Sequence, residues 1–329
     1  MDPLITIGVP TKNRAWCLAK VLDAIQQTDY PKNRIKLVFI DDYSTDKTWQ
    51  IFENWVSQHG SKYYDVKLLR QHTNIPEARN ICLAHAEGVY LLYWDSDVIP
   101  PRKDFLRSLV NTLEKDILIG AIGSSYVYEK PSLLTKVKKP PVSRYTNALY
   151  LGYTLIRYEI FKKVGGFNEE MLVGEDTEFF IRMIEKTDYK VKWAPEPVLH
   201  LRSPGARTTS PGGFLKLLRF SFKDRASGYF KEFKNLPLFL RFRIIYYLFL
   251  PISWMIVFFM YLFGFLSFWL TISWFFISLI PPLASAIRYS GIRCGIVTAL
   301  TTNIPTGLAL SYGILREAIY SSVNPSSRK

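Results

Sequence analysis

Short apolar runs alternate with amphipathic stretches along the first hundred residues. The runs are almost continuously apolar, as strands buried on both faces are, and lie at 4–9, 35–40, 66–69 and 89–94. The stretches between them have the spacing of helices and lie at 14–27, 46–56 and 76–86. This alternation with short connections predicts an α/β domain with a doubly wound, Rossmann-like and mostly parallel sheet.

Beyond Asp97 the pattern is looser but still mixed. We expect helices at 102–114 and 175–185, strands at 117–123 and 149–156, and an extended segment at 191–200 that two prolines interrupt. The Lys- and Pro-rich segment 129–144 is expected to be a loop. Residues 1–210 are therefore interpreted as one domain, large enough to be a catalytic domain.

The last third of the chain is strongly apolar. No charged residue occurs between Arg243 and Arg288, or between Arg293 and Arg316. A transmembrane helix needs roughly 20 apolar residues. Residues 241–329 are therefore expected to be a membrane region with two or three spans, at about 244–264, 266–287 and 294–315.

An amphipathic stretch at 214–230 precedes the apolar region. It indicates interfacial helices within 211–240, although an ordinary surface helix has the same pattern. The chain carries a net charge of +14, and eight basic residues gather between Lys216 and Arg243. Bases beside a membrane segment mark its cytoplasmic side and attract anionic lipid, so we favour membrane lipid over nucleic acid as the partner.

The start of the chain and its cysteines suggest a compartment. Without a signal-peptide pattern, we expect a multi-pass protein of the cell membrane with its catalytic domain in the cytoplasm. Cys17, Cys82 and Cys294 have neither metal-site spacing nor a paired framework, and are expected to be free thiols.

Three acidic clusters carry the candidate chemistry. Residues 41–46 (Asp-Asp-Tyr-Ser-Thr-Asp) follow the second predicted strand, where open α/β sheets bind ligands, although Asp41 or Asp46 capping the next helix would give the same pattern. Asp95-Ser96-Asp97 follows the fourth strand, and such a pair can share one Mg²⁺ or Mn²⁺ with substrate phosphates. Residues 174–178 open a predicted helix, where an acid serves either as general base or as an ordinary partner of the helix dipole.

The order of these motifs resembles that of the family 2 glycosyltransferases, which have the GT-A fold. The motifs that carry the resemblance are Ile7–Arg14 (IGVPTKNR), Asp41–Asp46, Ala78-Arg79-Asn80, Asp95-Ser96-Asp97, Val164–Glu169 (VGGFNE) and Glu175-Asp176. They extend over roughly residues 4–202.

The resemblance implies a role for each matching residue. Pro10, Thr11, Asp41 and Asp42 would bind the nucleotide, and Asp95 would face its ribose and diphosphate. Asp97, Asp95 and His200 would hold Mn²⁺ or Mg²⁺, with a structural histidine as the alternative for His200. Asp176 would be the catalytic base with Glu175 in support, and Gly165 and Gly166 would let the backbone approach a sugar. Arg79 would lie near the diphosphate or, alternatively, form an ion pair on a helix surface.

One departure bears on the product. Processive relatives carry Gln-x-x-Arg-Trp on an interfacial helix, whereas residues 214–220 contain neither Gln nor Trp. We therefore expect inverting, metal-dependent transfer of a single hexose to a polyprenyl-linked saccharide, as in N-glycan or glycolipid assembly, with mannose from GDP-mannose as the leading donor. The alternatives are a polyprenyl-phosphate hexose synthase and a non-catalytic sugar-binding scaffold.

Overall fold

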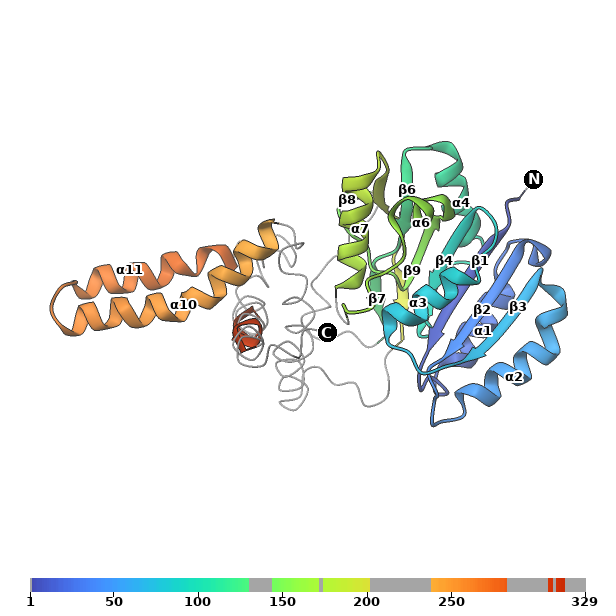
Figure 1. Cartoon of the computed structure of the whole chain (residues 1–329), viewed down its shortest axis with the longest axis horizontal. Helices are drawn as coiled ribbons and strands as arrows, with labels where there is room; N and C mark the ends of the chain where they lie inside the picture. Colours follow the sequence, from blue (N-terminus) through green and yellow to red (C-terminus); the bar gives the residue numbers. More distant parts are fainter. Residues whose placement is uncertain are drawn as a thin grey trace, which may run out of the picture. The chain divides into compact units, whose positions relative to one another are not determined.

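The computed structural model describes residues 2–129, 144–171, 174–201, 238–282, 307–309 and 312–316 (Figure 1). The chain divides into two compact units. The first contains residues 1–130 and 140–205, and the second contains 131–139 and 206–329.

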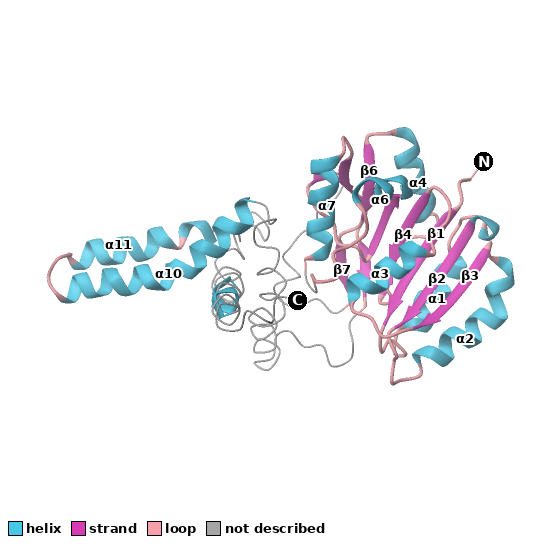
Figure 2. Ribbon diagram, in the orientation of Figure 1, coloured by secondary structure: helices cyan, strands magenta, loops and turns pink. Residues whose placement is uncertain are grey.

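A mixed sheet forms the centre of the first unit (Figure 2). In the described residues its strand order is β3-β2-β1-β4-β9-β6-β10-β8, and a smaller sheet has the order β5-β11-β7. The strands are β1 (Ile5–Thr11), β2 (Ile35–Asp41), β3 (Asp65–Arg70), β4 (Tyr90–Trp94), β5 (Val98–Ile99), β6 (Ile119–Gly123), β7 (Tyr126–Tyr128), β8 (Tyr145–Thr146), β9 (Tyr153–Arg157), β10 (Lys190–Trp193) and β11 (Val198–His200). β1 to β4 pair in parallel, whereas β9 runs antiparallel to both β4 and β6.

Helices cover both faces of this sheet because successive side chains of its strands point to opposite faces, and both faces are apolar. Leu92 of β4 belongs to one hydrophobic cluster and Leu91 to the other. The first cluster receives side chains from α1 (Leu18–Gln27), α2 (Thr48–His59) and α4 (Phe105–Lys115). The second receives side chains from α3 (Ile75–Ala84), α6 (Tyr158–Val164) and α7 (Glu175–Lys186). Short 3₁₀ turns, η1 (Lys32–Arg34) and η2 (Gly60–Lys62), complete the unit. The predicted α/β architecture with a mostly parallel sheet is confirmed.

The sequence pattern misplaced several boundaries. The first helix was predicted from residue 14, but α1 begins at Leu18 because residues 13–15 are bonded to the loop before α2. The extended segment 191–200 is split between two sheets, as β10 and β11. The pattern missed helix α6 and the short strands β5, β7 and β8. Strands of two or three residues are too short to establish a hydrophobic period.

The second unit contributes an apolar helix pair, α10 (Leu238–Leu262) and α11 (Phe268–Ser278). Within the described ranges, only residues 244–262 are both long and apolar enough to cross a membrane, with a mean hydropathy of 1.9. The predicted span at 244–264 therefore coincides with a suitable helix. At the span predicted at 266–287 an apolar helix is described over residues 268–282, and because residues 283–287 lie outside the described ranges the span stays a prediction. The interfacial segment 214–230 and most of the span at 294–315 lie outside the described residues.

Candidate active site

The parallel strands β1, β2 and β4 bring three motifs to one edge of the sheet. Thr11 at the end of β1 lies in register with Asp41 at the end of β2, and Asp95 directly follows β4. Ligands bind outside the carboxyl ends of strands in such sheets. The topology therefore explains why Thr11, Asp41 and Asp95, which are far apart in the sequence, lie at one site.

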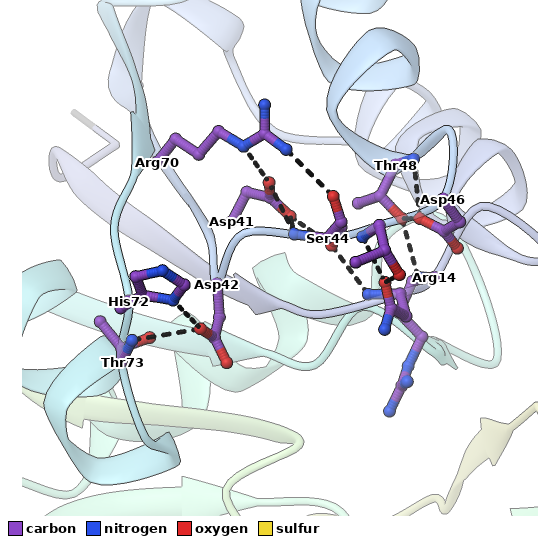
Figure 3. A network of polar contacts seen from close by, with 11 residues as sticks. Arg14, Asp41, Asp42, Ser44, Asp46, Thr48, Arg70, His72 and Thr73 are labelled. Atoms are coloured by element: carbon purple, nitrogen blue, oxygen red, sulfur yellow. Dashed lines mark hydrogen bonds and ion pairs between the residues drawn. The ribbon is translucent and has the colours of Figure 1, made fainter.

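Two loops above this edge are joined by a polar network (Figure 3). The backbone N–H of Asn13 donates to the Ser44 hydroxyl at 2.8 Å, and the Asn13 side chain accepts from the N–H of Thr45 at 2.8 Å. The N–H of Arg14 donates to the Thr48 hydroxyl at 2.8 Å. These bonds fix the loop after β1 against the loop after β2.

Asp41 belongs to this network and does not line the neighbouring cavity, which contains Asp42. Its side chain is fully buried, accepts from the N–H and hydroxyl of Ser44, and forms an ion pair with Arg70 Nε at 3.1 Å (Figure 3). The carboxylate has no exposed surface in this structure, so the predicted contact of Asp41 with a nucleotide stays a prediction. Asp41 orders the loop that presents Asp42.

Asp42 lies on the other side of the same loop, where its side chain lines the cavity. Its carboxylate accepts from Lys12 Nζ at 2.5 Å and from the N–H of Thr73 at 3.2 Å. The neighbouring Tyr43 has a φ of +40° and stacks on the exposed ring of His72, with 4.1 Å between the ring centres. A carboxylate beside an exposed aromatic pair can bind a heterocyclic base by hydrogen bonding and stacking.

Asp97 lies between a cation and an imidazole. Its Oδ2 is 3.2 Å from Arg14 Nε, and its Oδ1 is 3.9 Å from His200 Nε2. His200 Nδ1 is 2.6 Å from the carbonyl oxygen of Leu201. A carbonyl oxygen only accepts, so the proton in this contact lies on Nδ1, and Nε2 faces Asp97.

These groups line one cavity of about 580 Å³, a volume typical of a ligand site. The lining residues are Pro10, Thr11, Lys12, Asn13, Arg14, Asp42, Thr73, Asn74, Ile75, Ala78, Arg79, Asp95, Ser96, Asp97 and His200. Seven predicted site residues are among them: Pro10, Thr11, Asp42, Arg79, Asp95, Asp97 and His200. Five are not: Asp41, Gly165, Gly166, Glu175 and Asp176.

Arg79 connects the cavity to the third acidic cluster. It projects from α3, which approaches β1 closely because Gly8 has no side chain; a Cβ there would lie 2.7 Å from the Cβ of Cys82. The Arg79 guanidinium is buried, is paired with Glu175, and lies 3.9 Å from Asp95. The alternative of a helix-surface ion pair is therefore wrong, because this pair lies in the interior.

Burial and Arg79 act in opposite directions on three carboxyl groups. Burial raises the pKa values of Asp95, Glu175 and Asp176 above the ordinary range. The positive charge of Arg79 lowers each of these pKa values and limits the rise. Two bonds from Thr177 also favour ionised Asp176. Perturbed carboxyl groups beside a cavity are typical of a catalytic site.

The double glycine has a structural explanation in this unit. Gly165 ends α6 with a φ of +81°, which a residue with a side chain rarely adopts. A Cβ on Gly166 would lie 2.4 Å from the side-chain oxygen of Asn80, which accepts from the N–H of Phe167 at 2.8 Å. The two glycines thus let this turn pack against α3, and the predicted sugar contact is absent from the cavity lining.

The predicted cation ligands suit a hard metal ion with incomplete protein coordination. Among the described residues, no three His, Cys, Asp or Glu side chains form a group that could hold a metal. The cavity instead offers carboxylates from Asp95 and Asp97 and the imidazole of His200. Mg²⁺ commonly uses one or two carboxylates and takes its other ligands from water and substrate phosphates, so these donors fit Mg²⁺ or Mn²⁺.

Sequence reasoning gave no role to eight cavity residues, three of which contact Asp42 or Asp97. Lys12 pairs with Asp42 and Arg14 with Asp97, while Thr73 presents its backbone N–H to Asp42. Lys12 and Arg14 belong to the first motif, at residues 7–14. Their positive charge was the sequence feature that could have predicted pairing with the acidic motifs. Thr73 acts through its backbone, which no sequence pattern identifies.

Comparison with known families decides the class of the protein. The model of the family described as "Glycosyl transferase family 2" matches residues 6–172, just over half of the chain. The chain belongs to glycosyl transferase family 2. The non-catalytic scaffold is set aside, since this enzyme family accounts for the motifs that line the cavity.

The relatives of this glycosyltransferase differ in how much of it they match. Poly(ribitol-phosphate) beta-N-acetylglucosaminyltransferase TarS of Staphylococcus aureus (strain Mu50 / ATCC 700699) is 36% identical over 93 residues, which make up 28% of this chain and 16% of TarS. The putative colanic acid biosynthesis glycosyl transferase WcaA of Escherichia coli (strain K12) is 25% identical over 255 residues, covering 70% of this chain and 87% of WcaA. The chain therefore matches only a small part of the longer TarS.

A solved structure shares the fold of the glycosyltransferase. The mannosyltransferase PcManGT from Pyrobaculum calidifontis, in complex with GDP-Man and Mn²⁺, superposes with a TM-score of 0.57 and 19% identity. The match covers 98% of this chain and 88% of PcManGT. The predicted GT-A fold is thereby confirmed.

Proposed function

We propose that this glycosyltransferase moves a single hexose from a nucleotide sugar to a lipid-linked saccharide at the membrane surface, with inversion and with help from a divalent cation. The observation that carries the proposal is the convergence of Asp42, Asp97 and Arg79 on one cavity, with Arg79 paired to Glu175, the residue before Asp176. We infer one ligand that spans the cavity, with a base at one end and a diphosphate at the other.

The nucleotide would lie with its base beside Asp42. The carboxylate accepts hydrogen bonds, and a guanine edge offers two N–H donors where uracil offers one. Lys12 would have to share Asp42 with the base or turn toward the phosphates. GDP-mannose remains the leading donor, and PcManGT, whose structure contains GDP-Man and Mn²⁺, supports that choice.

The diphosphate would lie between the cationic and acidic sides of the cavity. Asp97, Asp95 and His200 would hold Mn²⁺ or Mg²⁺, which when bound neutralises the leaving diphosphate. Arg14 now pairs with Asp97 and would be released toward the phosphates. Arg79 also lines the cavity and would add positive charge beside the diphosphate.

Asp176 would act as the general base. The acceptor hydroxyl gives its proton to Asp176 while its oxygen bonds the anomeric carbon opposite the diphosphate. The C–O bond to the diphosphate breaks, and the nucleoside diphosphate leaves with the electron pair. Such one-step displacement inverts the anomeric carbon. Glu175 would hold Arg79 in place, because the two are paired in the interior.

A saccharide acceptor is favoured over a polyprenyl phosphate. A sugar hydroxyl needs a base, whereas a phosphate is already anionic, and Asp176 with its raised pKa suits the first task. The apolar helix α10 supports a membrane location for the acceptor.

A donor panel tests the proposal. The purified full chain should release nucleoside diphosphate from GDP-mannose in the presence of Mn²⁺ and a lipid-linked saccharide, and chelation should stop the release. UDP-glucose and UDP-N-acetylglucosamine are the competing donors. Faster turnover with either would replace mannose as the sugar, and transfer to polyprenyl phosphate alone would replace the acceptor.

A further inference from the structure

The arms α10 and α11 form an apolar hairpin with a tight turn at residues 263–267. No charged residue occurs from 244 to 287. The side chains at the tip are largely exposed in the described chain, Phe263 by 73% and Phe265 by 76%. A turn that met water on the far side of a membrane would be expected to carry polar residues.

The backbone N–H groups of turn residues 263–266 all donate within the hairpin. Gly264, with a φ of +76°, lets the chain reverse, and its N–H donates to the carbonyl of Tyr261 at 3.0 Å. The N–H groups of Phe265 and Leu266 both donate to the carbonyl of Met260. At the start of α11 the Ser267 hydroxyl accepts from the N–H of Leu270. Hydrocarbon requires such internal pairing, whereas water does not.

The hydroxyl groups along the arms are also paired internally. Ser253, Thr271 and Ser278 each donate to a backbone carbonyl three or four residues earlier in the same arm. The indole N–H of Trp254 donates to the Ser278 hydroxyl at 2.7 Å, joining α10 to α11. Bonds of this kind hold helix pairs together in lipid.

Both ends of the hairpin lie at the same level. The Tyr246 hydroxyl donates to the carbonyl of Ser278, so the end of α11 reaches the first turn of the apolar segment of α10. Arg241 and Arg243 lie just before that segment, and Arg288 is the next charged residue after α11. Along the sequence, the nearest bases therefore lie before the apolar segment of α10 and after α11, and the turn carries none.

The depth of the hairpin is the remaining consideration. The 19 apolar residues of α10 span about 28 Å at the usual rise per residue, slightly less than the roughly 30 Å of bilayer hydrocarbon. The apolar helix that contains α11 is described from Phe268 to Pro282 and spans about 22 Å over that length. The turn therefore ends within the hydrocarbon or at its far boundary.

From these observations we infer that α10 and α11 form a re-entrant hairpin: it inserts among the acyl chains from one face of an anionic bilayer, buries its turn there, and returns to the same face. The inference does not depend on the proposed function, because it uses only the second unit.

Cysteine accessibility in the full chain tests the inference. Phe265→Cys places a thiol at the tip, and Ile117→Cys, at a site 74% exposed in the first unit, marks the face of the catalytic domain. Both are made with Cys294 replaced by Ser; Cys17 and Cys82 are buried. A membrane-impermeant maleimide is applied to intact cells and to inverted membrane vesicles of an expression host. The Ile117 variant should be labelled on one face, and the tip variant on neither face until SDS is added.

Two results would overturn the inference. Labelling of the tip from the face opposite Ile117 would mean that the hairpin spans the bilayer. Labelling from the same face as Ile117 would mean that it is not inserted. Labelling after SDS shows that the tip thiol is present and reactive, and no readout depends on sugar transfer, so failure here is distinguishable from failure of the proposed function.

Discussion

Asp176→Asn is expected to lower kcat by about 10²–10⁴-fold, the usual contribution of a general base, with little change in the KM for the donor. Asparagine keeps the size and the hydrogen bonds at the start of α7 but cannot take a proton at neutral pH. Steady-state transfer to a saccharide acceptor measures the effect. Glu185→Gln is the matched control, because Glu185 is an exposed acid on the same helix.

The pH profile gives this prediction an independent readout. A base works only when ionised, and burial raises the pKa of Asp176. The acid limb of kcat should therefore lie at higher pH than an ordinary aspartate would give, with activity lost as pH falls through it. In Asp176→Asn the residual activity should lose this limb. Undiminished transfer by that variant would remove Asp176 from the role of base.

Arg79→Met is expected to destabilise the first unit by about 3–5 kcal/mol, the usual cost of leaving one member of a buried ion pair without its partner. Glu175 would remain buried without its counter-charge. Its pKa, already raised by burial and held down by Arg79, would rise further. A protein that contains a buried acid with a raised pKa becomes less stable as pH rises, because the acid must ionise in the interior. The loss of unfolding free energy in Arg79→Met should therefore be larger at pH 8 than at pH 5. Denaturant unfolding of the full chain, followed by tryptophan fluorescence, measures both effects.

Two further variants separate pairing from simple loss of an arginine. Arg107→Met breaks a more exposed ion pair, with Asp2 at 2.9 Å, and should cost no more than about 1 kcal/mol. The double variant Arg79→Met/Glu175→Gln should regain part of the lost stability, because it removes the unpaired charge of Glu175 while Asp95 still lacks Arg79. Equal losses of unfolding free energy in Arg79→Met and Arg107→Met would show that the buried position of the Arg79–Glu175 pair adds nothing to the cost of breaking it.

The sequence predicted the α/β unit well because its signals are local and repeated. The strand runs, the helix spacing and the proline in the first turn of α3 each depend on neighbouring residues. The first two acidic motifs were placed correctly at one sheet edge because parallel strands bring their carboxyl ends together. Asp42, Asp95 and Asp97 line the same cavity for that reason.

The remaining features depend on contacts between distant residues. Asp41 and Asp42 are adjacent, yet one is fully buried against Arg70 and the other faces the cavity. The pairing of Arg79 with Glu175 joins residues 96 positions apart. Patterns along the chain identify residue types and periods, but they do not report which side of a turn a side chain occupies.

The account depends most on the claim that one cavity binds the whole nucleotide sugar. A structure of the chain with Mn²⁺ and a nucleoside diphosphate tests it directly. We expect the base beside Asp42, and the cation on Asp97 with Nε2 of His200 turned toward it. A nucleotide bound elsewhere, or a cation with no contact to Asp97, would contradict the account.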